Sequence, residues 1–313
     1  AAAPAFTGLL NETYGSGAAA AYGTRRLNGN YSGACMTIRR ASDGTTQTIG
    51  FVGEEIDESA ITTFCTGTSC TVQVWHDQSQ TGGTGSGNDA EQTTPANQPT
   101  IYTGGQLVKD GGRLALDFDG SNDVLALSSV LIHGTTGRTI FSVIQADQQR
   151  NDGIVALNNA SASSGGNYNL TSEPVLRVSG GNQSWNGADL SNQTLATLTL
   201  PDSSGVNDAN LYLDGTLASQ VSTTTTTINT TNTGATQIGA FGTTTFDGNI
   251  QEVLLYASDK SSVRTDIEGN ISAYYQSAKL LDEQYGEGAE AAYSVRQLKR
   301  DNTECMVIRR ASD

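Results

Sequence analysis

Short clusters of apolar residues bounded by Gly, Asn, Asp, Ser or Thr recur along the chain. Within Thr71–His76 the apolar positions alternate, which places every second side chain, His76 included, on one face of a strand. Asp214-Gly215 separates two further clusters and is the strongest hairpin signal in the sequence. Short strands at regular spacing, joined by turn residues, are typical of a β-sandwich.

The expected fold class is therefore all-β: an antiparallel two-sheet jelly-roll sandwich with a few short helices, repeated in tandem. The predicted strands are Cys35–Arg40, Gln47–Val52, Thr71–His76, Arg113–Phe118, Val124–Leu127, Thr139–Gln145, Gly153–Leu157, Asn210–Leu213, Thr216–Ser219 and Asn249–Tyr256. Three helices are predicted: Ala18–Leu27, Asp57–Phe64 with a cap at Asp57 or Ser59, and the amphipathic segment Ser262–Tyr275.

An internal repeat divides the chain. Leu9–Tyr22 reappears as Leu280–Tyr293, and Cys35–Asp43 reappears as Cys305–Asp313. The expected organisation is a leader or linker over 1–8, one sandwich domain over 9–275, and the start of a second, incomplete copy over 276–313. Because so short a piece buries little surface, we expect it to continue into another domain or to pack against a neighbouring copy.

The net charge of the chain limits the kinds of molecule that it can bind. The net charge is −15 and the isoelectric point is about 4.4, so the surface repels nucleic acid and anionic membranes. No apolar run approaches the length needed to cross a bilayer. Such a chain suits an extracellular medium, at a cell or virion surface.

The cysteines support the same compartment. Cys65 and Cys70 flank a tight turn between a helical segment and a strand, which favours a local disulfide and an oxidising environment. Cys35 lies in a strand, where a small buried thiol is expected ahead of a bridge to a residue such as Cys305.

Several motifs resemble one family of glycoside hydrolases. The motifs are Ala20-Ala21-Tyr22, Arg25-Arg26-Leu27, Ile38-Arg39-Arg40-Ala41-Ser42-Asp43, Phe64-Cys65, Trp75-His76-Asp77-Gln78-Ser79 and Pro95-Ala96-Asn97-Gln98-Pro99. They resemble the first half of the α-L-arabinofuranosidase B catalytic domain. The second half, with Leu211-Tyr212-Leu213-Asp214-Gly215 and Phe246-Asp247-Gly248, looks like a concanavalin A-like (laminin G-like) jelly roll.

The resemblance also indicates where catalytic carboxyls would be expected. In this family the nucleophile lies in a Gly-Asn-Ala-Glu-like segment, which Asn158-Asn159-Ala160-Ser161 matches with a serine in place of the glutamate. The acid/base lies in a Gly-Gly-Asp-like loop, which Ile238–Gly242 matches without a carboxylate. Since a retaining glycosidase needs two carboxyls, these matches predict that the chain is not an enzyme.

Three further candidate roles are open. Asp77 is expected to accept hydrogen bonds from loop amides or to pair with Arg39 or Arg40. Trp185, with help from Tyr102, could stack on a sugar ring, although an aromatic packed on the sandwich edge is the commoner case.

A cation site is the third candidate. Asp117, Asp119 and Asp123 could gather around Ca²⁺, because hard cations take several oxygen ligands. Aspartates that simply form a turn explain the same pattern. No other cofactor is expected.

The leading functional expectation is a structural extracellular repeat of a surface filament, adhesin or phage tail fibre, whose partners are other copies of itself in head-to-tail contact. Alternatives are a glycan-binding, lectin-like module and an arabinofuranosidase-type hydrolase. Neither nucleic-acid binding nor membrane insertion is expected.

Overall fold

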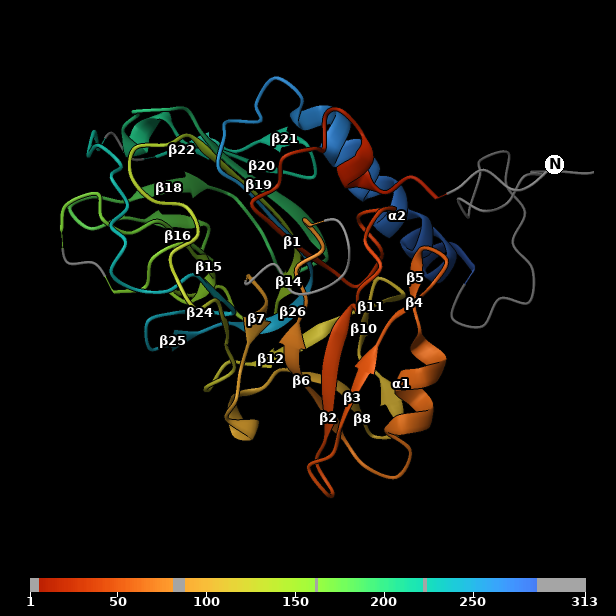
Figure 1. Cartoon of the computed structure of the whole chain (residues 1–313). Coiled ribbons are helices and arrows are strands. Elements are labelled where there is room, and N and C mark those ends of the chain that lie inside the picture. Colours follow the sequence, from red (N-terminus) through yellow and green to blue (C-terminus); the bar gives the residue numbers. More distant parts are fainter. Residues whose placement is uncertain (1–5, 81–87, 161–162, 222–223, 286–313) are drawn as a thin grey trace, which may run out of the picture.

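The computed structural model describes residues 6–80, 88–160, 163–221 and 224–285. The described chain is all-β, with short strands in a mainly antiparallel network and two α-helices, as Figure 1 shows. This confirms the predicted class. Strands β15 and β25 form a parallel pair.

One run of paired strands follows the order β3-β2-β6-β7-β13-β23-β15-β16-β17-β18-β22. Their bounds are β2 Met36–Arg40, β3 Thr46–Ile49, β6 Cys70–Trp75, β7 Ala90–Glu91, β13 Leu125–Ala126, β15 Gly153–Ala156, β16 Asn169–Thr171, β17 Val175–Arg177, β18 Gln183–Asn186, β22 Ser219–Gln220 and β23 Gln237–Ile238.

A second run follows the order β12-β26-β14-β19-β20-β21, with β1 beside the later part of β26. Its bounds are β1 Ala20–Gly23, β12 Leu116–Asp119, β14 Arg138–Ala146, β19 Thr194–Leu200, β20 Asn210–Leu213, β21 Thr216–Leu217 and β26 Asp247–Tyr256. Strand β8, Thr100–Thr103, pairs with both β6 and β12, and β9, Gln106–Leu107, follows it. The two runs therefore join in one continuous network instead of forming two separate sheets.

The remaining elements are short. They are η1 Leu9–Asn11, β4 Phe51–Val52, β5 Glu55–Ile56, η2 Pro95–Asn97, β10 Lys109–Asp110, β11 Arg113–Leu114, η3 Val206–Asp208, β24 Ala240–Phe241 and β25 Thr244–Thr245.

Two apolar layers hold the fold together. The larger lies between the two runs and includes Trp75, Phe118, Ile238 and Val253, all fully buried. The smaller lies on the other side of β14 and β26, where Phe141 and Leu254 belong to the same cluster as residues of the C-terminal helix. Strands β14 and β26 are thus covered on both faces, by the opposite run on one side and by the C-terminal helix on the other.

The predicted helix over Ala18–Leu27 is wrong. Residues Ala20–Gly23 form strand β1, which pairs with β26 and is completely buried. A short, uninterrupted apolar run has no period of its own, so its pairing partner decides its conformation. That partner lies far away in the sequence.

The other two helices are present. α1 spans Glu58–Phe64, and the Asp57 side chain caps it by accepting a hydrogen bond from the Ala60 amide at 2.9 Å. α2 spans Arg264–Tyr285 and passes through the expected domain boundary after Tyr275. Residues 286–313, which carry most of the predicted second copy, lie outside the described residues.

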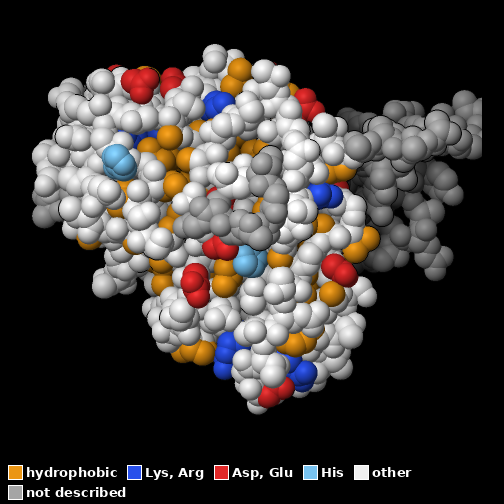
Figure 2. Space-filling view, in the orientation of Figure 1, with side chains coloured by type: hydrophobic (Ala, Val, Ile, Leu, Met, Phe, Trp, Pro, Cys, Tyr) orange, Lys and Arg blue, Asp and Glu red, His pale blue; other side chains and the backbone are white. Residues whose placement is uncertain are grey.

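On the face drawn in Figure 2, charged side chains are few and scattered among polar and apolar groups. Among the described residues, no helix is long and apolar enough to cross a membrane.

Candidate functional site

Two segments singled out from the sequence lie side by side. Strand β15, which precedes Asn158–Ser161, pairs with β23, which opens the Ile238–Gly242 segment; Val155 lies opposite Ile238. The Gly239 amide donates to the Ile154 carbonyl at 2.9 Å, and the Asn159 amide donates to the Ala235 carbonyl at 3.2 Å. The structure therefore brings together the two stretches that the resemblance marked as catalytic.

Neither stretch supplies a carboxylate among the described residues. Ser161 lies outside them, and Ala240–Gly242 has no acidic side chain. Asn158 is fully buried and fixes the turn: its amide donates to the carbonyls of Gly166 and Thr231, each at 2.9 Å, and its oxygen accepts from Ala160. Its role is structural, so acid chemistry here requires carboxylates from neighbouring strands.

Carboxylates lie on strand β12, the strand whose Phe118 ring contacts Gly239. A Cβ on Gly239 would come within 2.1 Å of the Phe118 ring, so the backbone of this loop packs directly on β12. Phe118 is flanked by Asp117 and Asp119. We call the group formed by Asp117, Asp119, Asp123, Asp147 and Asp247 the acidic cluster.

The acidic cluster is linked by backbone pairing as well as charge. Asp119 lies opposite Asp247 in the β12–β26 register, and the Asp147 amide donates to the Asp247 carbonyl at 2.9 Å. Burial raises the pKa of Asp117, and the charges of Asp147, Asp119 and Asp247 raise it further. Burial and neighbouring negative charge both disfavour the ionised form of the Asp117 carboxyl.

Asp123 is the most perturbed member of the cluster. Its side chain is 4% exposed, and burial raises its pKa to about 7, with smaller upward contributions from Asp119 and Asp117 and a downward one from the Asp119 amide. That amide donates to Asp123 Oδ2 at 3.0 Å. Asp119 itself is exposed and accepts from the Ser121 amide at 2.8 Å. A carboxyl with a pKa of about 7 can exchange a proton near neutral pH.

Arg150 supplies positive charge at the same edge. Its Nε lies 3.0 Å from the buried Asp152 carboxylate, and its terminal nitrogen lies 3.6 Å from Asp247. The same nitrogen donates to the Gly120 carbonyl at 3.2 Å. Asp147, Asp247 and Arg150 were not predicted as site residues, because they lie at or near the ends of strands that only the fold brings close to β12.

The calcium prediction at Asp117, Asp119 and Asp123 gains no support. Over the part of the chain that the structure describes, no group of three or more His, Cys, Asp or Glu side chains is arranged to hold a metal ion. Asp119 instead accepts from the turn amides of Ser121 and Asn122. The alternative explanation, that these aspartates form a turn, accounts for its geometry.

The two predicted sugar-stacking aromatics are buried. Trp185 on β18 is 5% exposed and Tyr102 on β8 is 4% exposed, and both belong to the main apolar core. A ring buried to this extent offers no face to a sugar. They pack as edge aromatics of the network.

Asp77 has the structural role expected for it. Its Oδ1 accepts from the amides of Ala21 and Ser79, each at 2.8 Å, which ties β1 to the loop after β6. Arg40 pairs with Asp43 at 3.8 Å, within the turn that follows β2. Arg39 extends from the same strand, with its guanidinium over Gly44.

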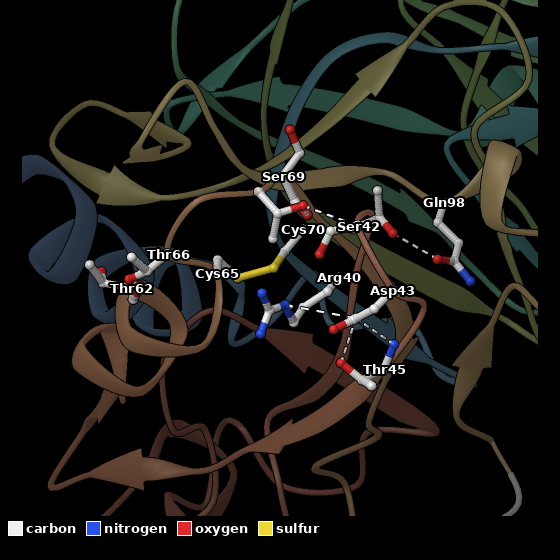
Figure 3. Close-up of a disulfide and its surroundings, with 12 residues drawn as sticks. Arg40, Ser42, Asp43, Thr45, Thr62, Cys65, Thr66, Ser69, Cys70 and Gln98 are labelled. Carbon is white, nitrogen blue, oxygen red and sulfur yellow. Dashed lines mark hydrogen bonds and ion pairs between the residues drawn. A yellow bond between two sulfur atoms is a disulfide. The ribbon is translucent and has the colours of Figure 1, made fainter.

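The predicted disulfide is present. Cys65 and Cys70 are bonded, with their Cα atoms 5.9 Å apart, and join the end of α1 to the start of β6 (Figure 3). Cys35 is a buried free thiol whose sulfur donates to the Gly23 carbonyl at 3.1 Å. Cys305 lies outside the described residues.

Comparison with known proteins identifies similarity to one enzyme family. A family model described as "Alpha-L-arabinofuranosidase B, catalytic" matches residues 11–116, less than half of the chain. Alpha-L-arabinofuranosidase B of Emericella nidulans is 42% identical over 74 residues, and that of Aspergillus niger is 40% identical over 74 residues. Each match covers 23% of this chain and 14% of the relative, so the chain spans a small part of these relatives' length.

Solved structures extend the similarity to the whole fold. An arabinofuranosidase complexed with arabinofuranosyl-α-1,2-xylobiose has a TM-score of 0.56 at 19% identity. A mutant GH54 α-L-arabinofuranosidase soaked with 4-nitrophenyl α-L-arabinofuranoside has a TM-score of 0.57 at the same identity. Each covers 81% of this chain and 62% of the solved chain. The fold is that of these enzymes, whereas a two-sheet concanavalin A-like jelly roll is not established.

These findings correct the functional expectations. The matching model describes a catalytic domain and the relatives are arabinofuranosidases, which contradicts both the non-catalytic structural repeat and the expectation that the chain is not an enzyme. The expectation of other copies as head-to-tail partners in a filament or adhesin is wrong on the same grounds. The prediction that the chain is not an enzyme rested on two loose motif matches without carboxylates, and these matches do not locate the catalytic groups. The chain is similar to the catalytic domain of α-L-arabinofuranosidase B.

Proposed function

We propose that the chain is a glycoside hydrolase of the α-L-arabinofuranosidase type, which removes arabinofuranosyl groups from extracellular glycans. The observation that carries the proposal is the match of the arabinofuranosidase B catalytic model to residues 11–116. Those residues include strands β1 to β11, helix α1 and the disulfide, and β1 pairs with β26. The disulfide supports an extracellular location.

The acidic cluster is the proposed source of the catalytic carboxyls. Asp117 is half-buried, and its pKa is raised by burial and by the charges of Asp147, Asp119 and Asp247, so it is suited to donate a proton to the leaving oxygen. Asp119 is exposed and its carboxylate is oriented by hydrogen bonds from two turn amides, so it is placed to stabilise or attack the developing oxocarbenium ion. Both side chains project from the same face of β12, two positions apart.

The test is hydrolysis of 4-nitrophenyl α-L-arabinofuranoside by the unmodified protein and by two variants. Asp117→Asn should lower kcat by about 10²-fold or more, since general acid catalysis is worth about 10²–10⁴. Asp119→Asn should lower kcat to a similar extent. Asp43→Asn, which changes an exposed turn aspartate far from the cluster in the sequence, is the matched control and should retain full activity.

Two results would contradict the proposal. Absence of turnover by the unmodified protein on several arabinofuranosides would refute the activity. Turnover that both cluster variants retain would refute the assignment of the carboxyls while leaving the activity in place.

A further inference from the structure

One outward face of the first strand run carries a continuous row of paired residues. Thr48 on β3 lies opposite Thr37 on β2, Thr37 lies opposite Val74 on β6, and Val74 lies opposite Glu91 on β7. The neighbouring row, which contains Met36 and Trp75, is fully buried in the core. Since side chains alternate along a strand, the row with Thr37 faces away from the core.

Two chemically active side chains meet Thr37 on this face. His76 follows Val74 by two positions and Asp89 precedes Glu91 by two, so both project toward the side on which Thr37 lies. His76 Nε2 lies 3.0 Å from Thr37 Oγ1, and His76 Nδ1 lies 2.8 Å from Asp89 Oδ2. The three residues come from three segments and form a hydroxyl–imidazole–carboxylate chain.

The hydrogen-bond partners of the His76 ring determine which of its nitrogens carries the proton. An ionised carboxylate can only accept, so in the neutral imidazole the proton sits on Nδ1 and is donated to Asp89. Nε2 then has a free lone pair and accepts from the Thr37 hydroxyl. This is the tautomer that a general base needs in order to take a proton from a hydroxyl.

A second hydrogen bond, from the backbone, fixes the orientation of the Asp89 carboxylate. The Asp77 amide donates to Asp89 Oδ1 at 2.9 Å, which leaves Oδ2 for His76. Burial acts to raise the pKa of Asp89, but the hydrogen bonds from His76 and the Asp77 amide outweigh it, and the pKa is lowered. The side chains of His76 and Asp89 are 21% and 25% exposed, so solvent reaches a pair whose geometry is fixed.

We propose that Thr37, His76 and Asp89 form a second hydrolytic centre, which cleaves small acyl esters and is separate from the acidic cluster. The Thr37 hydroxyl contacts the His76 base, and the Asp89 carboxylate orients that base. This is the arrangement that activates a hydroxyl nucleophile in hydrolases, and it is recognised by its geometry. Esters are the substrate class, because an alkoxide leaves far more readily than an amine and Thr37 is a secondary alcohol on a strand.

The reaction balances without any co-reactant except water. Thr37 Oγ1 attacks the ester carbonyl while its proton moves to His76 Nε2, and Asp89 stabilises the imidazolium that forms. The carbon–oxygen bond of the ester breaks, and His76 returns the proton to the departing alcohol. Water, deprotonated by His76, then cleaves the acyl-threonine, releasing the carboxylic acid and restoring the hydroxyl.

The experiment measures hydrolysis of 4-nitrophenyl acetate by the full chain and matched variants. Thr37→Val removes the hydroxyl and keeps the shape, and should lower the rate at least tenfold, whereas Thr37→Ser should retain it. His76→Gln and Asp89→Asn should also lose activity. Thr48→Val, on the adjacent strand of the same row, and His133→Gln, the other histidine, are controls that should leave the rate unchanged.

A direct readout separates catalysis from a structural role. Acid quenching during turnover, followed by peptide mass spectrometry, should find the acyl group on Thr37. An unchanged rate in Thr37→Val, or equal losses in His76→Gln and His133→Gln, would overturn the proposal. Hydrolysis of the arabinofuranoside should be unaffected by Thr37→Val, so the two proposed activities stand or fall separately.

Discussion

At Asp123, burial and charge act on one carboxyl. Its raised pKa means that the folded protein keeps a proton that the unfolded chain releases at its ordinary pKa near 4. Between about pH 4 and pH 7 the unfolded state therefore binds fewer protons, and stability falls as pH rises. This contribution is fully present below about pH 4 and is lost as pH reaches about 7.

This gives a test at Asp123 that does not depend on catalysis. Asp123→Asn cannot ionise, so its free energy of unfolding, relative to that of the unmodified protein, should increase as pH rises from 4 to 7. Urea unfolding at several pH values measures the difference. A difference that stays constant, or that changes in the opposite direction, would show that Asp123 has an ordinary pKa.

The cap of α1 gives a second prediction for a single residue. Asp57 accepts the Ala60 amide at 2.9 Å, so Asp57→Ala should lower the free energy of unfolding by about 1 kcal/mol. Asp57→Asn keeps an acceptor oxygen and should cost only a fraction of this. Chemical denaturation compares the three proteins, and equal losses in both variants would argue against the cap.

At the scale of elements, the local signals were reliable. The β20–β21 hairpin turns at Asp214 and Gly215, both with positive φ, as a two-residue turn of this kind requires. The β2–β3 hairpin, α1 and the disulfide also occur where the sequence predicted them. Each depends on residues a few positions apart, so the sequence contains the whole signal.

The disulfide between α1 and β6 stabilises by restricting a short loop. Replacing both cysteines, as Cys65→Ser with Cys70→Ser, should lower the free energy of unfolding by about 2 kcal/mol, the value for so short a loop. Denaturation with and without reductant checks this. The unmodified protein under reducing conditions should approach the double variant, and a stable variant would contradict the prediction.

The β23–β24 connection gives a second prediction for an element. Gly239 has φ +80° and its Cβ would meet Phe118, whereas Gly242 has φ +64° and room around it. Gly239→Ala should therefore cost several kcal/mol, and Gly242→Ala only about 1 kcal/mol for its backbone. Thermal unfolding compares the two variants. Similar losses of stability would mean that the Phe118 ring moves aside at little energetic cost.

At the scale of the whole molecule, one buried ion pair ties the chain ends to the network. Arg25, just after β1, donates to both oxygens of Glu252 on β26 at 2.8 and 3.1 Å. It also donates to Asn270 on α2 at 3.0 Å. The side chains of Arg25 and Glu252 are at most 1% exposed. Water therefore solvates neither charge, and each charge is stabilised by the other.

Breaking this pair should be costly. Arg25→Met would leave Glu252 buried without its partner and lower the free energy of unfolding by about 3–5 kcal/mol. Lys109→Met, which removes an exposed partner of Glu58, should cost at most about 1 kcal/mol. The double variant Arg25→Met with Glu252→Met should recover part of the loss. A larger loss in the double variant would show that packing, and not charge, dominates.

The sequence by itself determined the all-β class, the hairpins, the α1 cap and the disulfide, because each of these is encoded by neighbours along the chain. Only the tertiary structure decided that Ala20–Gly23 is a strand, since β26 supplies its partner. It also gathered the acidic cluster from the ends of β12, β14 and β26, and brought Thr37, His76 and Asp89 into contact. These sites depend on strand register between distant segments, where a shift of one residue would turn each side chain to the opposite face.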